Sequence, residues 1–243
     1  MRKKVILLIC LLIVFASSYI YFHFFSSLQN KYLTKEQKVM VQNIPYSVQL
    51  STLNIEKNQL YCNYKSANKK EKIALINKAK TLYIEQISNH IFPYWYGTKW
   101  DFNGTTQTPQ QGKIACGYFV TTILEDIDFP LNRVSLACMA SEEMIKNLTQ
   151  SKYIYHISNT SISAFESKIK DIGKGIYIVG LDKHTGFILY DEKGVFFIHS
   201  GGRFPCHVRK EKIKESPTII KSQYKVVGKI SDDEQFILKW LSY

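Results

Sequence analysis

Cysteine is scarce in this chain of 243 residues, with five copies and no Cys-x-x-Cys pair. A disulfide scaffold needs a denser set of cysteines in a chain of this length, and most structural zinc sites need paired thiolates. No internal repeat, long low-complexity segment or nucleic-acid-binding motif is present either. These absences exclude a disulfide-rich module, and they predict a protein that uses no metal or other cofactor and binds no nucleic acid.

Acidic residues are also few, since 20 Asp and Glu face 32 Lys and Arg, for a formal net charge of +12. Such a balance suits an acidic partner such as anionic lipid or an acidic cell-wall polymer. The lysines are scattered in short clusters, so a solvated basic surface is the simpler interpretation. A hydrophobic share of 45% with a charged share of 21% predicts a folded domain with a core.

The N-terminus carries an almost unbroken apolar run. Arg2, Lys3 and Lys4 precede it, and it extends over residues 5–25, roughly the 20 residues that span a bilayer. A cleaved signal peptide would have a shorter apolar core and a small-residue cleavage site. We therefore predict a signal anchor within residues 1–28 that holds the rest outside the cytoplasm, on the periplasmic or cell-surface side. Cleavage would instead give a secreted protein.

The remaining chain is predicted to form an α+β domain. Residues 29–69 are polar and suit a spacer or an edge strand, whereas residues 70–243 carry the periodic apolar patterns of a catalytic-sized domain. Helices are expected over 70–93, from Cys116, over 134–140, 141–148 and 163–172, and from Ser231. Strands are expected from Ile176, Thr185, Val195 and Gln223. This order predicts an antiparallel sheet with the Cys116 helix packed on its face.

Cys116 and two histidines form the candidate chemistry. A thiol attacks a carbonyl as its thiolate, and a helix N-terminus with a neighbouring imidazole lowers the thiol pKa. Cys116 begins a predicted helix, His184 precedes one strand and His199 ends the next. The predicted turn at Lys193-Gly194 leaves the two histidines offset in register. If they meet, His199 fixes the tautomer of His184, as the third member of a catalytic triad does.

This order of Cys, His and His resembles the NlpC-type cell-wall cysteine peptidases of the papain-like superfamily, over roughly residues 94–200. The stretch Tyr94-Trp95-Tyr96-Gly97-Thr98 is similar to the family's upstream motif. The family usually has Asp before its cysteine and Ser-Gly after it, whereas this chain has Ala115 before and Gly117-Tyr118 after. The resemblance implies a papain-like fold and hydrolysis of an amide bond, typically in the peptide stem of peptidoglycan.

The same resemblance suggests substrate-binding positions. It matches Tyr94, or else Tyr96, to a tyrosine that lines the family's site. Trp95 and Trp100 either wall a substrate groove or pack beneath their loop. Gln110 and Gln111 lie near the position where papain-like enzymes carry an oxyanion-hole glutamine.

Other functions remain open at this point. Acyl transfer instead of hydrolysis uses the same residues. A membrane-tethered binding module would keep the fold and its aromatic groove without turnover. A zinc-dependent hydrolase would need a site seeded by Cys206 and His207 near His199. Cys62, Cys138 and Cys206 are most simply structural, although two of them could pair outside the cytoplasm.

Overall fold

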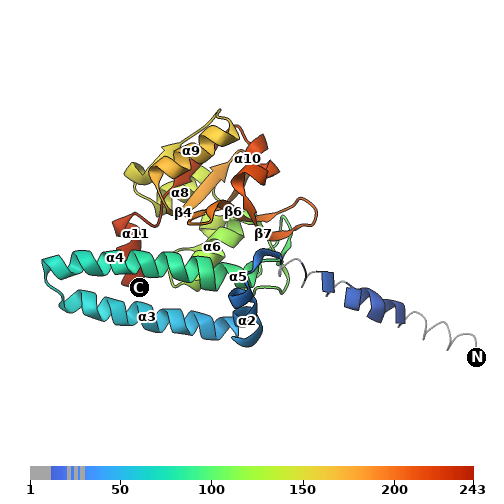
Figure 1. Ribbon diagram of the computed structural model, residues 1–243, viewed down its shortest axis with the longest axis horizontal. Coiled ribbons are helices and arrows are strands. Elements are labelled where there is room, and N and C mark those ends of the chain that lie inside the picture. The colour runs from blue at the N-terminus through green and yellow to red at the C-terminus, as the bar shows by residue number, and fades with distance from the viewer. Residues whose placement is uncertain (1–11, 21–22, 25–26, 28–30) are drawn as a thin grey trace, which may run out of the picture.

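The computed structural model describes residues 12–20, 23, 24, 27 and 31–243, and it has an α+β architecture (Figure 1). The helices, with short 3-10 and π segments marked η, are α2 (Lys35–Asn43), α3 (Tyr46–Ser66), α4 (Lys69–Glu85), η1 (Gln86–Ile91), α5 (Phe92–Trp95), α6 (Cys116–Asp126), α7 (Arg133–Ala137), α8 (Ser141–Leu148), η2 (Ser151–Tyr153), α9 (Ile162–Ile172), η3 (Ile213–Glu215), α10 (Pro217–Lys221) and α11 (Glu234–Leu241). The strands are β1 (Lys99–Trp100), β2 (Lys113–Ile114), β3 (Ile154–His156), β4 (Gly175–Leu181), β5 (His184–Asp191), β6 (Gly194–Gly201), β7 (His207–Lys212) and β8 (Lys225–Gly228).

One mixed sheet of eight strands runs in the order β2-β1-β7-β6-β5-β4-β8-β3. Only β1 and β2 pair in parallel; the other neighbours are antiparallel. The meander from β4 to β7 follows chain order, because two-residue turns join β4 to β5 and β5 to β6. The four strands expected from the apolar runs are confirmed, whereas the charged strand β7 was not predicted.

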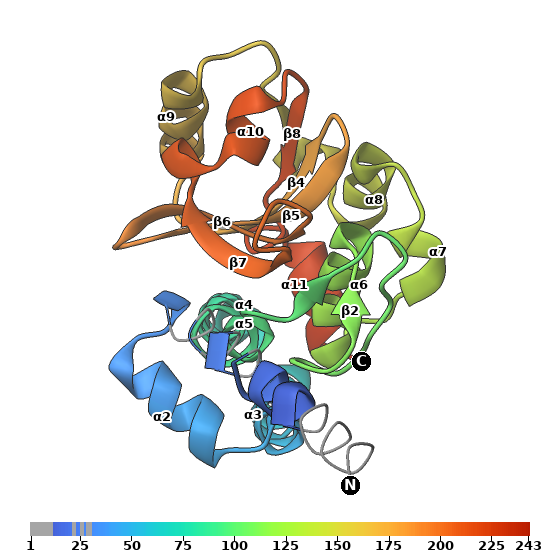
Figure 2. The same cartoon turned by 90° about the vertical axis from the view of Figure 1, so that its right-hand side faces the viewer.

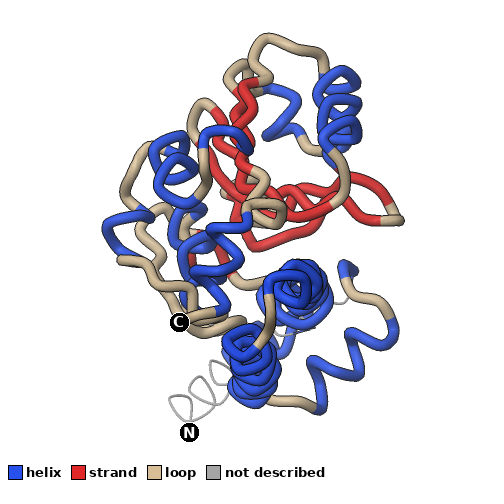
Figure 3. The backbone as a smooth tube through the Cα atoms, turned by 90° about the vertical axis from the view of Figure 1, so that its left-hand side faces the viewer, coloured by secondary structure: helices blue, strands red, loops and turns tan. Residues whose placement is uncertain are grey.

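Helices cover both faces of the sheet (Figures 2 and 3). On one face, α6 packs its apolar side against Phe187 and Ile198, within a core that also takes in α4, α5 and α11. On the other face, α9 and η3 cover a second apolar cluster around Tyr177, Val179 and Phe197. The prediction of a cysteine-bearing helix packed on the sheet is confirmed.

The segment 29–69 is expected to be a spacer or an edge strand, but its described residues, 31–69, are mostly helical. From Thr34 onward they fold into α2 and the long helix α3, which pairs with α4 in an antiparallel hairpin (Figure 1). Thr34 begins α2 with a capping box, in which its side chain accepts a hydrogen bond from the Gln37 backbone N–H. Leu53 and Leu60 of α3 are buried in the core that reaches the sheet. The segment is thus part of the domain that carries Cys116.

Two predicted helix starts are corrected. α9 begins one residue earlier than expected, because Ser161 and not Ser163 caps it, accepting from the Ala164 backbone N–H. α11 begins at Glu234 and not at Ser231, because Asp233 caps it. The Ser231 hydroxyl instead accepts a hydrogen bond from the backbone N–H of Ile176 on β4.

The predicted signal anchor falls largely on residues that the structure does not describe. Of the run over 5–25, only residues 12–20, 23 and 24 are described. Within the described residues, we find no helix with the length and apolar character needed to cross a bilayer.

Candidate active site

Cys116 is the first residue of α6, and the fold fixes its position from both sides. The apolar face of α6, including Phe119, Val120 and Ile123, is buried against the sheet. The N-terminus of α6 therefore lies near the first residues of β5, where the backbone N–H groups of Thr185 and Gly117 act on the Cys116 sulfur and lower the thiol pKa. These donors and the helix dipole favour a thiolate, but burial outweighs them and raises the thiol pKa.

The hairpin of β5 and β6 brings His184 and His199 together. The ladder pairs Asp191 with Gly194 and Phe187 with Ile198. Continued toward the open end of the hairpin, this register sets each histidine diagonally across from the other, on one face of the sheet. The Nε2 atom of His184 lies 2.7 Å from the Nδ1 atom of His199. The sequence predicted that the two histidines would be offset in register. This offset places them diagonally across the strand pair, and in that arrangement the rings of His184 and His199 meet.

Glycines provide the space for this pair. In the continued register, Gly186 lies opposite His199 and Gly201 lies opposite His184. A Cβ atom on Gly201 would lie 2.6 Å from Cε1 of His199, and one on Gly186 would lie 2.8 Å from Cβ of His199. Neither position can therefore carry a side chain unless the histidines move.

Glu211 on β7 extends the pair into a row of three. The ladder of β6 and β7 sets His199 opposite Arg209, and Glu211 follows two residues later on the same face. Its Oε1 atom lies 3.1 Å from Nε2 of His199. The hydrogen bond with His199 lowers the Glu211 pKa against the effect of burial, which raises it, so Glu211 is a carboxylate at neutral pH.

These contacts assign a proton to each ring nitrogen of the row. A carboxylate only accepts, so Nε2–H of His199 donates to Glu211. His199 is neutral, because burial lowers its pKa, and its Nδ1 is then an acceptor for Nε2–H of His184. The Nδ1 atom of His184 is left with a free lone pair. Glu211 and His199 thus fix His184 in the tautomer of a base.

The row also keeps His184 uncharged. Burial first, and then the neighbouring His199 and Arg209, lower the pKa of His184 to about 3. Since burial raises the thiol pKa of Cys116, the resting pair is a neutral thiol beside a neutral imidazole. Among the described residues, no hydrogen bond joins Cys116 to His184.

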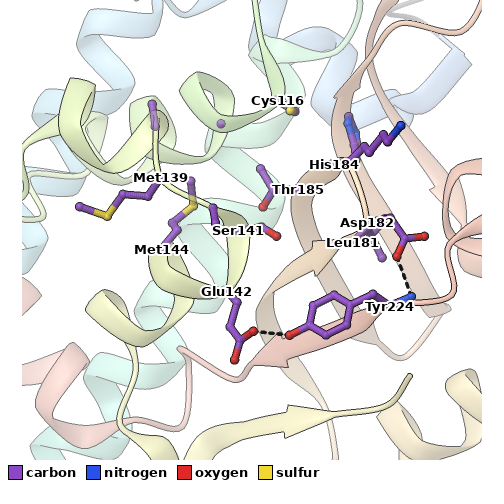
Figure 4. Close-up of a pocket in the computed structure, with 14 residues that line it drawn as sticks. Cys116, Met139, Ser141, Glu142, Met144, Leu181, Asp182, His184, Thr185 and Tyr224 are labelled. Atoms are coloured by element: carbon purple, nitrogen blue, oxygen red, sulfur yellow. Dashed lines mark hydrogen bonds between the residues drawn. The ribbon is translucent and has the colours of Figure 1, made fainter. Parts of the chain in front are cut away.

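Cys116 and His184 lie at one end of a pocket of about 400 Å³ (Figure 4). The opposite wall comes from α7, α8 and the loop between them, where Ala137, Met139, Ala140 and Met144 give an apolar lining. Glu142 and Tyr224 close the far end, with the Tyr224 hydroxyl hydrogen-bonded to the Glu142 carboxylate. Cys116 and His184 therefore border a pocket with an apolar wall, and the Glu142 carboxylate at its far end also lies 3.1 Å from the Lys146 ammonium.

The aromatic residues expected to bind substrate are buried elsewhere. Tyr94, Trp95 and Tyr96 are at most 5% exposed, and none of them lines the Cys116 pocket. The Tyr94 hydroxyl donates to the backbone oxygen of Ile44 at 2.8 Å, and Trp95 Nε1–H donates to the Tyr46 hydroxyl at 3.0 Å. These three side chains hold α5 against the N-terminal helices.

Trp100 and the two glutamines also lie outside the Cys116 pocket. The Trp100 ring packs against Gly202, whose Cβ position lies 2.8 Å from the ring. The Gln110 amide donates to the backbone oxygens of Tyr94 and Tyr96, so it braces its own loop. Gln111 is exposed on that loop.

Cys206 and His207 have local partners. The Cys206 thiol donates to the backbone oxygen of Gly202 at 3.0 Å, and His207 Nε2 lies 3.3 Å from the Tyr32 hydroxyl. Over the part of the chain that the structure describes, no three His, Cys, Asp or Glu side chains are grouped to hold a metal ion. Cys62 and Cys138 are exposed free thiols.

Sequence reasoning missed three features of the site: Glu211, Arg209 and the Glu142–Tyr224 wall. Glu211 and Arg209 lie in the charged stretch His207–Lys212, which has no apolar alternation to mark it as a strand. Glu142 and Tyr224 are 82 positions apart in the chain and meet only because α8 packs on β4 and β8. No protein-family model, curated protein or solved structure matches this chain.

Proposed function

We propose that this chain is a thiol hydrolase of papain-like fold that cleaves an amide bond. The observation that carries the proposal is the hydrogen-bonded row Glu211–His199–His184, which ends beside Cys116 at the N-terminus of α6. A buried row of this kind fixes one tautomer of His184. That tautomer leaves a ring nitrogen free to accept a proton, which is what a base next to a thiol needs.

In the proposed reaction, the Cys116 sulfur adds to the amide carbonyl while its proton passes to Nδ1 of His184. The carbonyl oxygen becomes negative near the free N–H groups of the first turn of α6. His184 then gives the proton to the leaving amine, and a thioester remains on Cys116. Water, deprotonated by His184, hydrolyses this thioester and releases a carboxylic acid.

The proposed substrate is a peptide, and the resemblance of the Cys, His and His order points to the peptide stem of peptidoglycan. The mainly apolar pocket is of a size for one or two side chains next to the scissile bond. An apolar N-terminus after three basic residues supports a location outside the cytoplasm, with the protein anchored in the membrane, or secreted if the segment is cleaved.

The pH dependence of Cys116 alkylation tests the activated pair. A lone thiol reacts through its thiolate, so its rate falls about tenfold per pH unit below its pKa. If Cys116 passes its proton to the neutral imidazole of His184 during the attack, the reactive state is the neutral pair, whose population is constant between the two pKa values of the pair. We expect iodoacetamide to alkylate Cys116 at a nearly constant rate from about pH 5 to about pH 8.

The control lies within the same chain. Cys62 is an exposed thiol on α3 with no histidine bonded to it, and peptide mapping by mass spectrometry separates its alkylation from that of Cys116. Cys62 should show the steep pH dependence, and Cys116 should acquire it in His184→Ala. A steep profile at Cys116 in both the wild type and His184→Ala would contradict the proposal.

One observation favours a second candidate function, a tethered binding module without turnover. Burial raises the Cys116 pKa, and no hydrogen bond joins this thiol to His184 among the described residues. In that case the pocket binds a peptide side chain, and Cys116 behaves as a buried thiol in the alkylation experiment. Acyl transfer to an amine instead of water uses the proposed residues unchanged, and the products of a peptide substrate distinguish it from hydrolysis.

A further inference from the structure

A second pocket lies on the far side of the histidine row from Cys116. Its volume is about 760 Å³, and it is bordered by the N-terminal segment over 31–34, the hairpin of β5 and β6, and strand β7. Arg209 and Glu211 of β7 line it, whereas neither lines the Cys116 pocket. The proposed hydrolase reaction does not use this pocket.

The charged lining of this pocket is predominantly basic. Five cationic side chains line it: Lys31, Lys193, Arg209, Lys210 and Lys212. Three carboxylates also line it: Asp191, Glu211 and Glu215. Two of these carboxylates already have partners, since Glu211 bonds to His199 and Glu215 lies 3.8 Å from the Lys212 ammonium.

Arg209 is the residue that points most clearly to an anionic ligand. Its side chain is only 9% exposed, and within the described chain it forms no ion pair with a carboxylate. One guanidinium nitrogen, Nη2, donates to the backbone oxygens of Gly201 and Arg203, but Nε is buried without a hydrogen-bond partner. Glu211 of the same strand interacts with this cation at longer range, but among the described residues no carboxylate contacts the guanidinium. A buried cation without a direct partner is costly, and a guanidinium fits carboxylate and phosphate oxygens well.

Aromatic side chains form the rest of the wall. Tyr32, Phe196 and Phe204 line the pocket, and Phe204 is 86% exposed. The Lys210 ammonium lies 4.1 Å from the centre of the Phe196 ring, so a cation and an apolar face adjoin each other. We infer that this pocket binds a small organic anion, with a phosphate or carboxylate at its basic lining and an apolar group against the aromatic wall.

Calorimetric titration of the full-length protein in nonionic detergent tests this site with two probes, inorganic phosphate and phenyl phosphate. We expect one saturable site for each, with phenyl phosphate at least about tenfold tighter because its ring contacts the aromatic wall. Added sodium chloride should weaken both, as for any exposed charge contact. A folded protein that binds neither probe, or binds both with equal affinity, would overturn the inference.

Substitutions locate the binding. Lys193→Gln with Lys210→Gln removes two cations from the rim without touching the buried guanidinium, and we expect at least about fivefold weaker binding of phenyl phosphate. Lys152→Gln is the matched control, because this exposed lysine lies beside β3, at the opposite end of the sheet from β7. Equal affinities for the double variant and the wild type would overturn the assignment to this pocket. Arg209→Lys, if it folds, should weaken binding further.

Discussion

Each side chain of the row from Glu211 to His184 limits what its neighbour can do. The carboxylate can only accept, so His199 must donate from Nε2, and His184 must then donate to His199. The negative charge of Glu211 therefore determines which ring nitrogens of His199 and His184 carry a proton, and His184 is left in the tautomer of a base. Cys116, His184 and His199 were the candidates predicted from their order in the sequence. Glu211 was not predicted, because nothing in a charged stretch of sequence indicates which glutamate will form a hydrogen bond with a histidine.

The lowered pKa of His184 predicts how far its action as a base extends into acid. The base must be neutral to accept the thiol proton, so Cys116 alkylation fails as the pH falls through the His184 pKa. An ordinary histidine would protonate near 6.5, whereas burial and neighbouring positive charge lower this pKa to about 3. We expect the alkylation rate at about pH 5 to remain within about twofold of its value at pH 7. A rate that halves near pH 6.5 would contradict this electrostatic picture.

At the scale of elements, the hairpin of β5 and β6 that carries the two histidines depends on glycines, which have no side chain. Gly201→Ala places a Cβ atom 2.6 Å from Cε1 of His199, while Gly201 itself has no positive φ that would strain an alanine. We therefore expect a folded protein in which His199 is displaced and the flat pH profile of Cys116 becomes steep. Circular dichroism checks the fold, and alkylation checks the row. A folded Gly201→Ala protein with the wild-type profile would refute the importance of this close contact.

The sequence could predict a helix or strand when the side chains that the element buries are apolar. Strands β4, β5 and β6 and helix α6 are apolar where they enter the core, so their patterns identified them. Helix α3 was missed because its four buried positions alternate in character: Gln49, Leu53, Lys57 and Leu60. A buried lysine and glutamine break the apolar period of the helix. Their partners, Asp128 and Gln86, are far away in the chain and cannot be paired with them from the sequence.

The same long-range pairing decided the role of the aromatic stretch over residues 94–96. Because this stretch lies just before a glycine and a polar loop, the sequence was equally consistent with aromatic side chains that line a substrate groove and with side chains buried in the core. Tyr46 of α3 accepts the Trp95 N–H, so the outcome depended on a helix that the sequence did not predict. Once α2 and α3 are helical, their apolar faces need cover, and Tyr94 and Trp95 supply it.

At the scale of the whole molecule, the N-terminal helices and the sheet share one core. Leu53 is 2% exposed and belongs to the same apolar cluster as Phe119, Phe187 and Trp240. Leu53→Ala should therefore lower the free energy of unfolding of the whole domain by about 2–4 kcal/mol. Ile55→Ala, two residues along α3 at a side chain that is 70% exposed, should change it by less than about 0.5 kcal/mol.

Urea unfolding of the full chain, followed by circular dichroism and by loss of the flat Cys116 alkylation profile, measures both variants. Because the layers share a core, the two signals should change together, and Leu53→Ala should shift both midpoints to lower urea by the same amount. If α3 were an independent appendage, Leu53→Ala would melt helix early while Cys116 kept its profile. That outcome would separate the N-terminal helices from the unit that carries Cys116, and residues 29–69 would then act as the spacer that their polarity suggested.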